Sequence, residues 1–415
     1  MPTDLQSKTL LLQAWRAGVG AVGGERATRD ALAADGIKDA THLLAVGKAA
    51  GAMCAGAMGA LAPDGRMLAV SKYGHFDAAF AARPRATVME AGHPLPDENS
   101  LRAGKAAAEF VGAAGADARL VMLVSGGASA LAEELPRGVE LDALRRLNRA
   151  LLGGGFDIAQ INAARMRASG IKGGKLLRRF RGASAHVYAI SDVRGDDIGI
   201  IGGGLGALGG ALPPLPEVSG EAGELLAKFA AENKNDGENG DENAPAFNYR
   251  ARVIATNRDA RDAAEKFLRE NGLHIAANEE SLHRDIHAAA RRLGAALRDG
   301  PAGAYIWGGE PGVTLPPKPG RGGRNQSLAL LLAGEIRGRR GISALVAGTD
   351  GDDGSGGADI AAGALIDGAT FTATRGAARA LEKADAGTYL ARIAALFKPG
   401  PTGTNVMDLA LAIKS

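Results

Sequence analysis

The chain has 415 residues, more than one hydrophobic core usually supports, so its length predicts two domains. A formal net charge of +3 and 4% aromatic residues argue against a nucleic-acid-binding platform, and 61 glycines indicate tight turns between strands and helices. A single cysteine, Cys54, rules out a disulfide framework. No signal-peptide pattern opens the chain, and no apolar run is long enough to span a bilayer, so we expect a cytoplasmic protein without membrane contacts.

The first predicted strand, residues 42–46, runs directly into Gly47-Lys48 and a helical pattern. A cation at a helix start opposes the helix dipole unless an anion accompanies it, which indicates anion binding by Lys48. A solvated surface lysine is the other interpretation. The segment is no Walker A loop, because the earlier glycine and the Ser or Thr after the lysine are missing.

The clearest buried strand, residues 120–124, is followed by a turn that contains Ser125, Gly126, Gly127 and Ser129. Glycine and serine turns of this kind can hold a phosphate or a carboxylate with backbone amides and hydroxyl groups. The turn does not fit the G-x-S-x-G pattern of a nucleophile elbow. We therefore expect anion binding here and no acyl transfer at Ser129.

Two polar residues farther along the chain are weaker candidates. Lys172 stands just before a double glycine at a helix boundary, although basic residues on helices usually form a solvated face. Asp192 follows the predicted strand 185–190 and has Asp196 and Asp197 nearby. A carboxylate at the end of a strand is a candidate for binding magnesium or a substrate hydroxyl.

Residues 204–209 fit the G-x-G-x-x-G spacing of dinucleotide-binding turns. That motif must open a helix, and the prolines at 213, 214 and 216 do not allow one here. The segment therefore predicts a glycine-rich loop and not a nicotinamide site.

The stretch from Ile306 to Ser327 contains a predicted strand, a Pro-rich loop and the start of a helical pattern at Ser327. Its strand ends at Gly309-Glu310, and Arg324 lies beside the expected helix start. Arginines and glycines next to a helix N-terminus suit an anion. Taken alone, the stretch fits an ordinary surface loop about as well.

Two further glycine-rich loops, 348–354 and 400–406, follow or precede predicted strands near the C-terminus. The first contains Asp350, and neither has the glutamate that ends a twelve-residue calcium loop. They are better interpreted as loops that face phosphate or magnesium.

Together these motifs resemble those of the MOFRL-type glycerate 2-kinases, in the same order and over nearly the whole chain. The motifs that carry the resemblance are Gly47-Lys48-Ala49-Ala50, Lys72-Tyr73-Gly74-His75, Gly92-His93-Pro94-Leu95-Pro96-Asp97, Ser125-Gly126-Gly127-Ala128-Ser129-Ala130-Leu131, Ile171-Lys172-Gly173-Gly174, Ile190-Ser191-Asp192-Val193, Gly309-Glu310, Gly323-Arg324-Asn325-Gln326, Gly348-Thr349-Asp350-Gly351 and Pro401-Thr402-Gly403-Thr404-Asn405.

The resemblance implies an α/β fold with a larger Rossmann-like N-terminal domain, a smaller MOFRL domain and an active site in the cleft between them. On this chain we expect the first domain at residues 1–230, a connecting α/β segment at 246–300 and the MOFRL domain at 301–415. Residues 231–245 are polar and low in complexity, which predicts a disordered insertion.

The activity that the resemblance implies is transfer of the γ-phosphoryl group of ATP to the 2-hydroxyl of D-glycerate, with Mg²⁺. Lys48 and Arg324 match the family's catalytic residues, and we expect Arg324 rather than Arg321 to face the phosphates. Asp192 and Asp350 are the expected metal contacts. The expected phosphate or substrate contacts are Ser125, Gly126, Gly127, Ser129, Lys172, Glu310, Asn325, Thr402 and Asn405.

Two segments depart from the family pattern, Gly202–Gly206 and Arg165–Ser169, and they leave the preferred hydroxy acid open. An NAD(P)-dependent hydroxypyruvate reductase is the alternative enzyme, which the failed dinucleotide motif disfavours. A non-catalytic ligand-binding protein is the third hypothesis, and the presence of both Lys48 and Arg324 disfavours it. The sequence leaves a homodimer open.

Overall fold

The computed structural model describes residues 3–153, 156, 158–209, 212, 214–215, 218–235, 247–354, 360–372 and 376–415. The chain forms two compact units. The middle unit consists of Gly24–Ile254, and the terminal unit combines Met1–Gly23 with Ala255–Ser415. Each contains its own six-stranded sheet, so the expected α/β class is confirmed.

The sheet of the middle unit has the strand order β3-β2-β1-β4-β5-β6. Strand β1 pairs in parallel with β2 and β4, and the pairs β2–β3 and β4–β5 are also parallel. This is the order of doubly wound nucleotide-binding sheets, in which ligands bind where the order reverses, here between β1 and β4. The strands are β1 (Ala40–Val46), β2 (Leu61–Lys72), β3 (Ala86–Ala91), β4 (Arg119–Val124), β5 (Ser184–Ile190) and β6 (Asn248–Ala255).

Helices cover both faces of this sheet, which is why its central strands are apolar on both sides. Leu44 and Val46 of β1 share one core with Ala103 and Ala107 of α5, while α3 packs on the opposite face together with α2. Helices α7, α8 and α9 enclose a separate small core. The helical segments are α2 (Gly24–Ala34), α3 (Ala50–Ala57), η1 (Met58–Ala60), α4 (Ala78–Ala81), α5 (Glu98–Gly112), α6 (Ala128–Leu131), α7 (Leu141–Gly153), α8 (Ile158–Ala168), η2 (Leu177–Arg179), η3 (Ile201–Gly203) and α9 (Gly220–Asn235).

The sheet of the terminal unit is mixed, with the order β11-β10-β9-β12-β8-β7. Only the β7–β8 pair is parallel among the strand pairs of this sheet that the structure describes. Its strands are β7 (Ile275–Glu280), β8 (Gly303–Gly309), β9 (Ile342–Gly348), β10 (Gly363–Asp367), β11 (Leu396–Phe397) and β12 (Asp408–Lys414).

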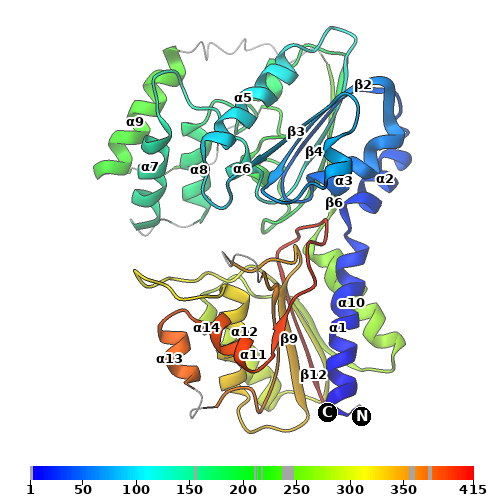
Figure 1. Cartoon of the computed structure of the whole chain (residues 1–415), viewed down its shortest axis with the longest axis vertical. Helices are drawn as coiled ribbons and strands as arrows, with labels where there is room; N and C mark the ends of the chain where they lie inside the picture. The colour runs from blue at the N-terminus through cyan, green and yellow to red at the C-terminus, as the bar shows by residue number, and fades with distance from the viewer. Residues whose placement is uncertain are drawn as a thin grey trace. The chain divides into compact units, whose positions relative to one another are not determined.

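Helices α1 and α10 pack on one face of this mixed sheet, and α11 and α12 cover the other (Figure 1). On the second face Trp307 of β8 shares a core with Leu293 of α11 and Leu330 of α12. The helices are α1 (Asp4–Ala21), α10 (Asn257–Glu270), α11 (Ile286–Asp299), α12 (Arg324–Glu335), α13 (Ala377–Glu382) and α14 (Ala386–Arg392).

The first helix, α1, belongs to the terminal unit because its side chains pack there. Trp15 contacts Phe397 edge to face at 4.9 Å between ring centroids, and the Lys8 ammonium lies 2.6 Å from the Asp367 carboxylate. At Gly18 the helix approaches α10 so closely that an added Cβ would lie 2.7 Å from a backbone oxygen. The helix comes first in the chain, so its position in the sequence places it in the expected N-terminal domain, residues 1–230.

The compact units therefore differ from the expected domains 1–230, 246–300 and 301–415. Residues 255–300 supply α10, β7 and α11 to the mixed sheet, so they are part of the terminal unit and not a connecting segment. The predicted insertion 231–245 begins too early, since α9 continues to Asn235. The rest of that insertion lies outside the described residues.

Helix α5 gives a test of this packing, because two of its glycines differ in surroundings. A Cβ on Gly104 would lie 2.0 Å from the Glu133 backbone oxygen, whereas one on Gly112 would have only the Arg179 Cβ at 4.0 Å. We expect Gly104→Ala to lower the free energy of unfolding by about 1–3 kcal/mol, because the backbone must move. The matched variant Gly112→Ala should be neutral or slightly stabilising. Thermal unfolding followed by far-UV circular dichroism measures both, and equal melting temperatures would contradict the close contact.

Candidate functional site

The turn after β1 brings Gly47-Lys48 against the turn after β4. The Lys48 N–H donates to the Gly126 carbonyl at 2.9 Å, and the Ser125 N–H donates to Val46 at 3.0 Å. These bonds join the ends of the two central strands, where the strand order of the sheet reverses. Lys48 and the Ser125–Ser129 turn thus meet at the edge where doubly wound sheets bind their ligands.

Gly47 and Ser125 fix this junction. Gly47 has φ = +137°, and a Cβ on it would lie 2.1 Å from the Ser125 hydroxyl, so only glycine fits. The buried Ser125 hydroxyl accepts the Ala49 N–H at 3.0 Å, just before helix α3. Ser125 therefore supports the turn from beneath, and its predicted ligand contact remains a prediction.

Gly127 places a histidine beside Lys48. It has φ = +86°, and a Cβ on it would lie 3.0 Å from Cδ2 of His93 and 3.3 Å from Cγ of Lys48. His93 was not among the predicted site residues. The signal that could have found it is its position two residues after the end of β3, within the motif Gly92-His93-Pro94.

In the terminal unit, Arg324 is the first residue of helix α12. The helix begins three residues before the predicted start at Ser327, because Asp353 caps it from a distant loop. The Asp353 carboxylate accepts the Asn325 N–H at 2.9 Å and the Gln326 N–H at 2.7 Å. A protein carboxylate thus occupies the place at this helix N-terminus where the sequence predicted a bound anion.

Arg324 lies between two further carboxylates. Its Nη2 is 2.5 Å from Oε1 of Glu310, and its Nε donates to Oδ2 of Asp408 at 2.9 Å. The Asn325 side chain donates to the other oxygen of Asp408 at 2.8 Å. Burial acts to lower the pKa of Arg324, but Asp408 and Glu310 outweigh it and raise that pKa. The structure thus brings together three predicted residues, Arg324, Asn325 and Glu310, and adds Asp408 and Asp353, which the sequence did not single out.

Comparison with known proteins relates both parts of the chain to described families. Residues 10–209 match a domain described as a domain of unknown function, DUF4147, and residues 303–408 match the MOFRL family. A D-glycerate 2-kinase of Thermotoga maritima is 31% identical, over 98% of each chain. The crystal structure of the glycerate kinase from that organism superposes with a TM-score of 0.78, covering 98% of this chain and 99% of the other.

The chain belongs to the glycerate 2-kinase family. A protein of Agrobacterium vitis is 34% identical, over 88% of this chain and 97% of its own length. Its name is hydroxypyruvate reductase, with that activity marked as unproven. Both names thus occur among relatives of similar identity.

Ser129 and Lys172, which family resemblance placed at the substrate, meet around Gly203. A Cβ on Gly203 would lie 3.0 Å from Cδ of Lys172 and 3.2 Å from the Ser129 hydroxyl. The Gly173 N–H also donates to the Gly203 carbonyl at 2.9 Å. Gly202, Gly203 and Gly204 are all left-handed, so the segment that departs from the family pattern forms a glycine turn against these side chains.

Lys172 differs from its predicted role as an anion contact. Its side chain is 2% exposed and its ammonium pairs with the carboxylate of Glu133, which is 1% exposed. Burial lowers the pKa of Lys172, although Glu133 opposes that shift. Ser169 also donates to Glu133 and accepts the Lys172 N–H at 3.2 Å. The positive charge is neutralised within the protein, so Lys172 supports the Gly203 turn from inside.

The two C-terminal loops contact each other through backbone and hydroxyl groups. A Cβ on Gly351 would lie 2.0 Å from the Gly400 oxygen, and the Thr402 hydroxyl donates to the Thr349 carbonyl at 2.6 Å. Asp350 accepts the Asp352 N–H at 3.0 Å, and Asn405 is buried. Thr402 thus fastens one loop to the other, and the ligand contacts predicted for it and for Asn405 remain predictions.

The predicted metal contacts lie in different units, Asp192 in the middle unit and Asp350 in the terminal unit. Within the described ranges no group of three or more His, Cys, Asp or Glu side chains could hold a metal ion. A magnesium ion that arrives with a nucleotide needs only one or two protein carboxylates, since phosphates and water complete its shell. The metal contacts of Asp192 and Asp350 remain predictions.

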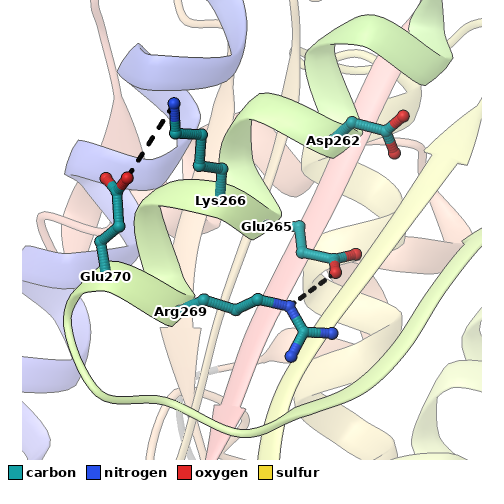
Figure 2. Close-up of a pocket in the computed structure, with 5 residues that line it drawn as sticks. All are labelled: Asp262, Glu265, Lys266, Arg269 and Glu270. Carbon is teal, nitrogen blue, oxygen red and sulfur yellow. Dashed lines mark hydrogen bonds and ion pairs between the residues drawn. The ribbon is translucent and has the colours of Figure 1, made fainter.

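A shallow surface pocket on α10 contains none of the predicted residues. Figure 2 shows the five charged side chains that line it, in which Arg269 pairs with Glu265 at 2.8 Å and Lys266 with Glu270 at 4.0 Å. Hydrogen bonds from Asn278 and Arg269 lower the pKa of Glu265. Paired charges one helical turn apart are typical of a solvated helix face, so we assign no ligand here.

No helix in the described part of the chain combines the length and the apolar character needed to cross a membrane.

The buried Lys172–Glu133 pair predicts a non-additive effect on stability. Lys172→Met or Glu133→Gln alone should each lower the free energy of unfolding by about 3–5 kcal/mol, because a buried charge loses its partner. The double variant should recover much of that loss, since both charges are gone. Urea unfolding followed by far-UV circular dichroism gives the three values. Additive losses in the double variant would contradict a direct pair.

Asp353 predicts a pH dependence. Burial raises its pKa to about 7, although its two backbone donors act to lower it. The folded state then binds more protons than the unfolded state between about pH 4 and 7, so this contribution to stability falls as pH rises. We expect the stability of the wild type relative to Asp353→Asn to decrease by about 1–3 kcal/mol across that window.

Tryptophan fluorescence can follow this unfolding, because Trp15 and Trp307 both lie in the terminal unit with Asp353. Denaturant titrations at pH 4.5 and 7.5 for both proteins give the comparison. A relative stability that is constant or rises with pH would contradict a raised pKa.

Proposed function

We propose that this chain transfers the γ-phosphoryl group of ATP to the 2-hydroxyl of D-glycerate, giving 2-phosphoglycerate and ADP. The observation that carries the proposal is similarity to glycerate 2-kinases over 98% of the chain. The two residues expected to be catalytic, Lys48 and Arg324, both carry a positive charge. Lys48 stands at the switch point of the doubly wound sheet, and Arg324 stands at the first turn of α12.

Phosphoryl transfer asks the protein mainly to position two substrates and to stabilise charge on the transferring oxygens. Lys48 supplies a positive charge from a turn whose backbone is fixed by Gly126. Arg324 supplies a planar donor that suits phosphate or carboxylate oxygens. The backbone at Gly126 and Gly127 supports the same role, because a glycine turn lets an anion approach its amide groups.

Mg²⁺ that arrived with ATP would neutralise negative charge on the phosphate groups. Asp192 or Asp350 would hold it. A cytoplasmic location is part of the proposal, since the single cysteine, Cys54, is buried as a free thiol.

In the part of the chain that the structure describes, the glycine motif at 204–209 does not form a comparable site for a reductase. After the glycine motif at 204–209, the next helix among the described residues is α9, which begins only at Gly220. A dinucleotide turn needs a helix that starts at the motif and receives the pyrophosphate. The arrangement thus favours phosphoryl transfer over hydride transfer.

The test is a coupled assay for ADP release with D-glycerate and MgATP, beside an NADH-oxidation assay with hydroxypyruvate. We expect turnover only in the first, and a loss of ~10²–10³-fold in Lys48→Ala and in Arg324→Ala. Lys105→Ala and Arg26→Ala are matched controls, because both side chains form exposed helical ion pairs, and they should keep wild-type rates.

Absence of ADP release with D-glycerate and related hydroxy acids would overturn the kinase proposal. NADH oxidation with hydroxypyruvate would favour the reductase instead. Full turnover in Lys48→Ala or Arg324→Ala would leave the reaction in place and refute the site.

A further inference from the structure

We propose that Arg324 has two carboxylate partners with different roles: Asp408 is fixed and positions the guanidinium, whereas Glu310 is exchangeable and marks the place of the bound anion. The inference rests on the proposed function, because it describes how Arg324 would receive a phosphate or carboxylate group of the substrates. It assigns roles to contacts that lie wholly within the terminal unit.

Asp408 is buried, and both of its carboxylate oxygens accept hydrogen bonds. Its side chain is 3% exposed, and its two oxygens accept from Arg324 Nε and from the Asn325 amide. It is the first residue of β12, opposite Gly309 of β8 and Gly348 of β9 in the sheet. Because both carboxylate oxygens are hydrogen-bonded and the residue lies on a central strand, the Asp408 side chain is held in place. It therefore sets the orientation of the Arg324 guanidinium.

Glu310 contrasts with Asp408 in each of these respects. It follows the last residue of β8, outside the sheet, and its side chain is 44% exposed. Its contact to Arg324 is an ion pair at Nη2, whose strength water screens. Its backbone N–H is anchored to His283 at 3.4 Å, so the side chain can leave while the strand end stays in place.

The two carboxylates contact different nitrogen atoms of Arg324, so an incoming anion can replace Glu310 without displacing Asp408. Asp408 occupies the Nε atom, and Glu310 occupies the Nη2 atom of a side chain that is itself 34% exposed. Phosphate and carboxylate oxygens bind guanidinium groups through parallel N–H donors. An incoming anion therefore competes with Glu310 for Arg324, while Asp408 keeps the guanidinium oriented throughout.

Asn325 adds support on the same helical turn. Its side-chain nitrogen is committed to Asp408, while its Oδ1 is buried and has no hydrogen-bond donor among the described residues. A buried acceptor without a donor is uncommon in folded proteins. Asp408 thus orients two adjacent residues of α12, one cationic and one with an unused acceptor.

The fixed role is tested by a double-mutant cycle. Asp408→Asn should lower kcat by at least ~10-fold in the wild-type background and by less than ~2-fold in the Arg324→Ala background, because its effect passes through the arginine. Asp408→Glu should recover part of the activity. Asp367→Asn, which removes the Lys8 pair of the same unit, is the matched control and should keep wild-type turnover.

The exchangeable role is tested with Glu310→Gln. Removing the competing charge should lower the KM for ATP or for D-glycerate by ~2–5-fold. Binding of pyrophosphate, measured by isothermal titration calorimetry, should tighten by a similar factor in Glu310→Gln and weaken in Arg324→Ala. This second measurement needs no turnover, so it remains decisive if the proposed reaction is wrong.

Several outcomes would overturn the inference. Equal losses from Asp408→Asn with and without Arg324 would show that Asp408 acts on stability alone, and tryptophan fluorescence of the terminal unit would detect that loss. A raised KM for both substrates, or weaker pyrophosphate binding, in Glu310→Gln would show that Glu310 binds substrate directly. A wild type that binds pyrophosphate as expected but releases no ADP would instead refute the reaction.

Discussion

A buried carboxylate that holds a cation is the interaction on which both halves of the candidate machinery depend. In the middle unit Glu133 pairs with Lys172 beneath the Gly203 turn. In the terminal unit Asp408 pairs with Arg324 at the start of α12. Such pairs cost desolvation, and a single missing partner leaves a buried charge, so they fix local geometry more than they add stability. In this protein Glu133 fixes Lys172 in a turn, and Asp408 fixes Arg324 at the first residue of α12.

Glycine provides the complementary constraint, because it lets these oriented groups approach one another. Gly47 leaves no room for a side chain beside Ser125, and Gly127 brings His93 next to Lys48. Gly203 does the same between Ser129 and Lys172. Gly47 and Gly127 lie in the turns after β1 and β4, and Gly203 lies in the turn η3, so each stands where backbone and side-chain groups meet closely. A methyl group at any of these positions would push these neighbouring groups apart.

The terminal unit shows how the same anion-binding features can be used internally. Sequence placed a bound anion at the start of α12, and the Asp353 carboxylate takes that position. Arg324 keeps a partly exposed guanidinium, so the external anion is expected at the side chain and not at the helix terminus. Under the proposed function, Arg324 would contact the ligand with a geometry that Asp408 sets.

The sequence by itself determined the α/β class, most strands and helices, and the polar residues that follow the strands. It also determined the family of the chain, through motifs that include Lys48 and Arg324. These features depend on local hydrophobic periodicity and on short motifs, which survive in a linear pattern. Only the tertiary structure decided that α1 packs with the C-terminal sheet and that Lys172 and Arg324 have the partners Glu133 and Asp408. Those partners lie 39 and 84 residues away in the chain, and no local pattern encodes a contact of that kind.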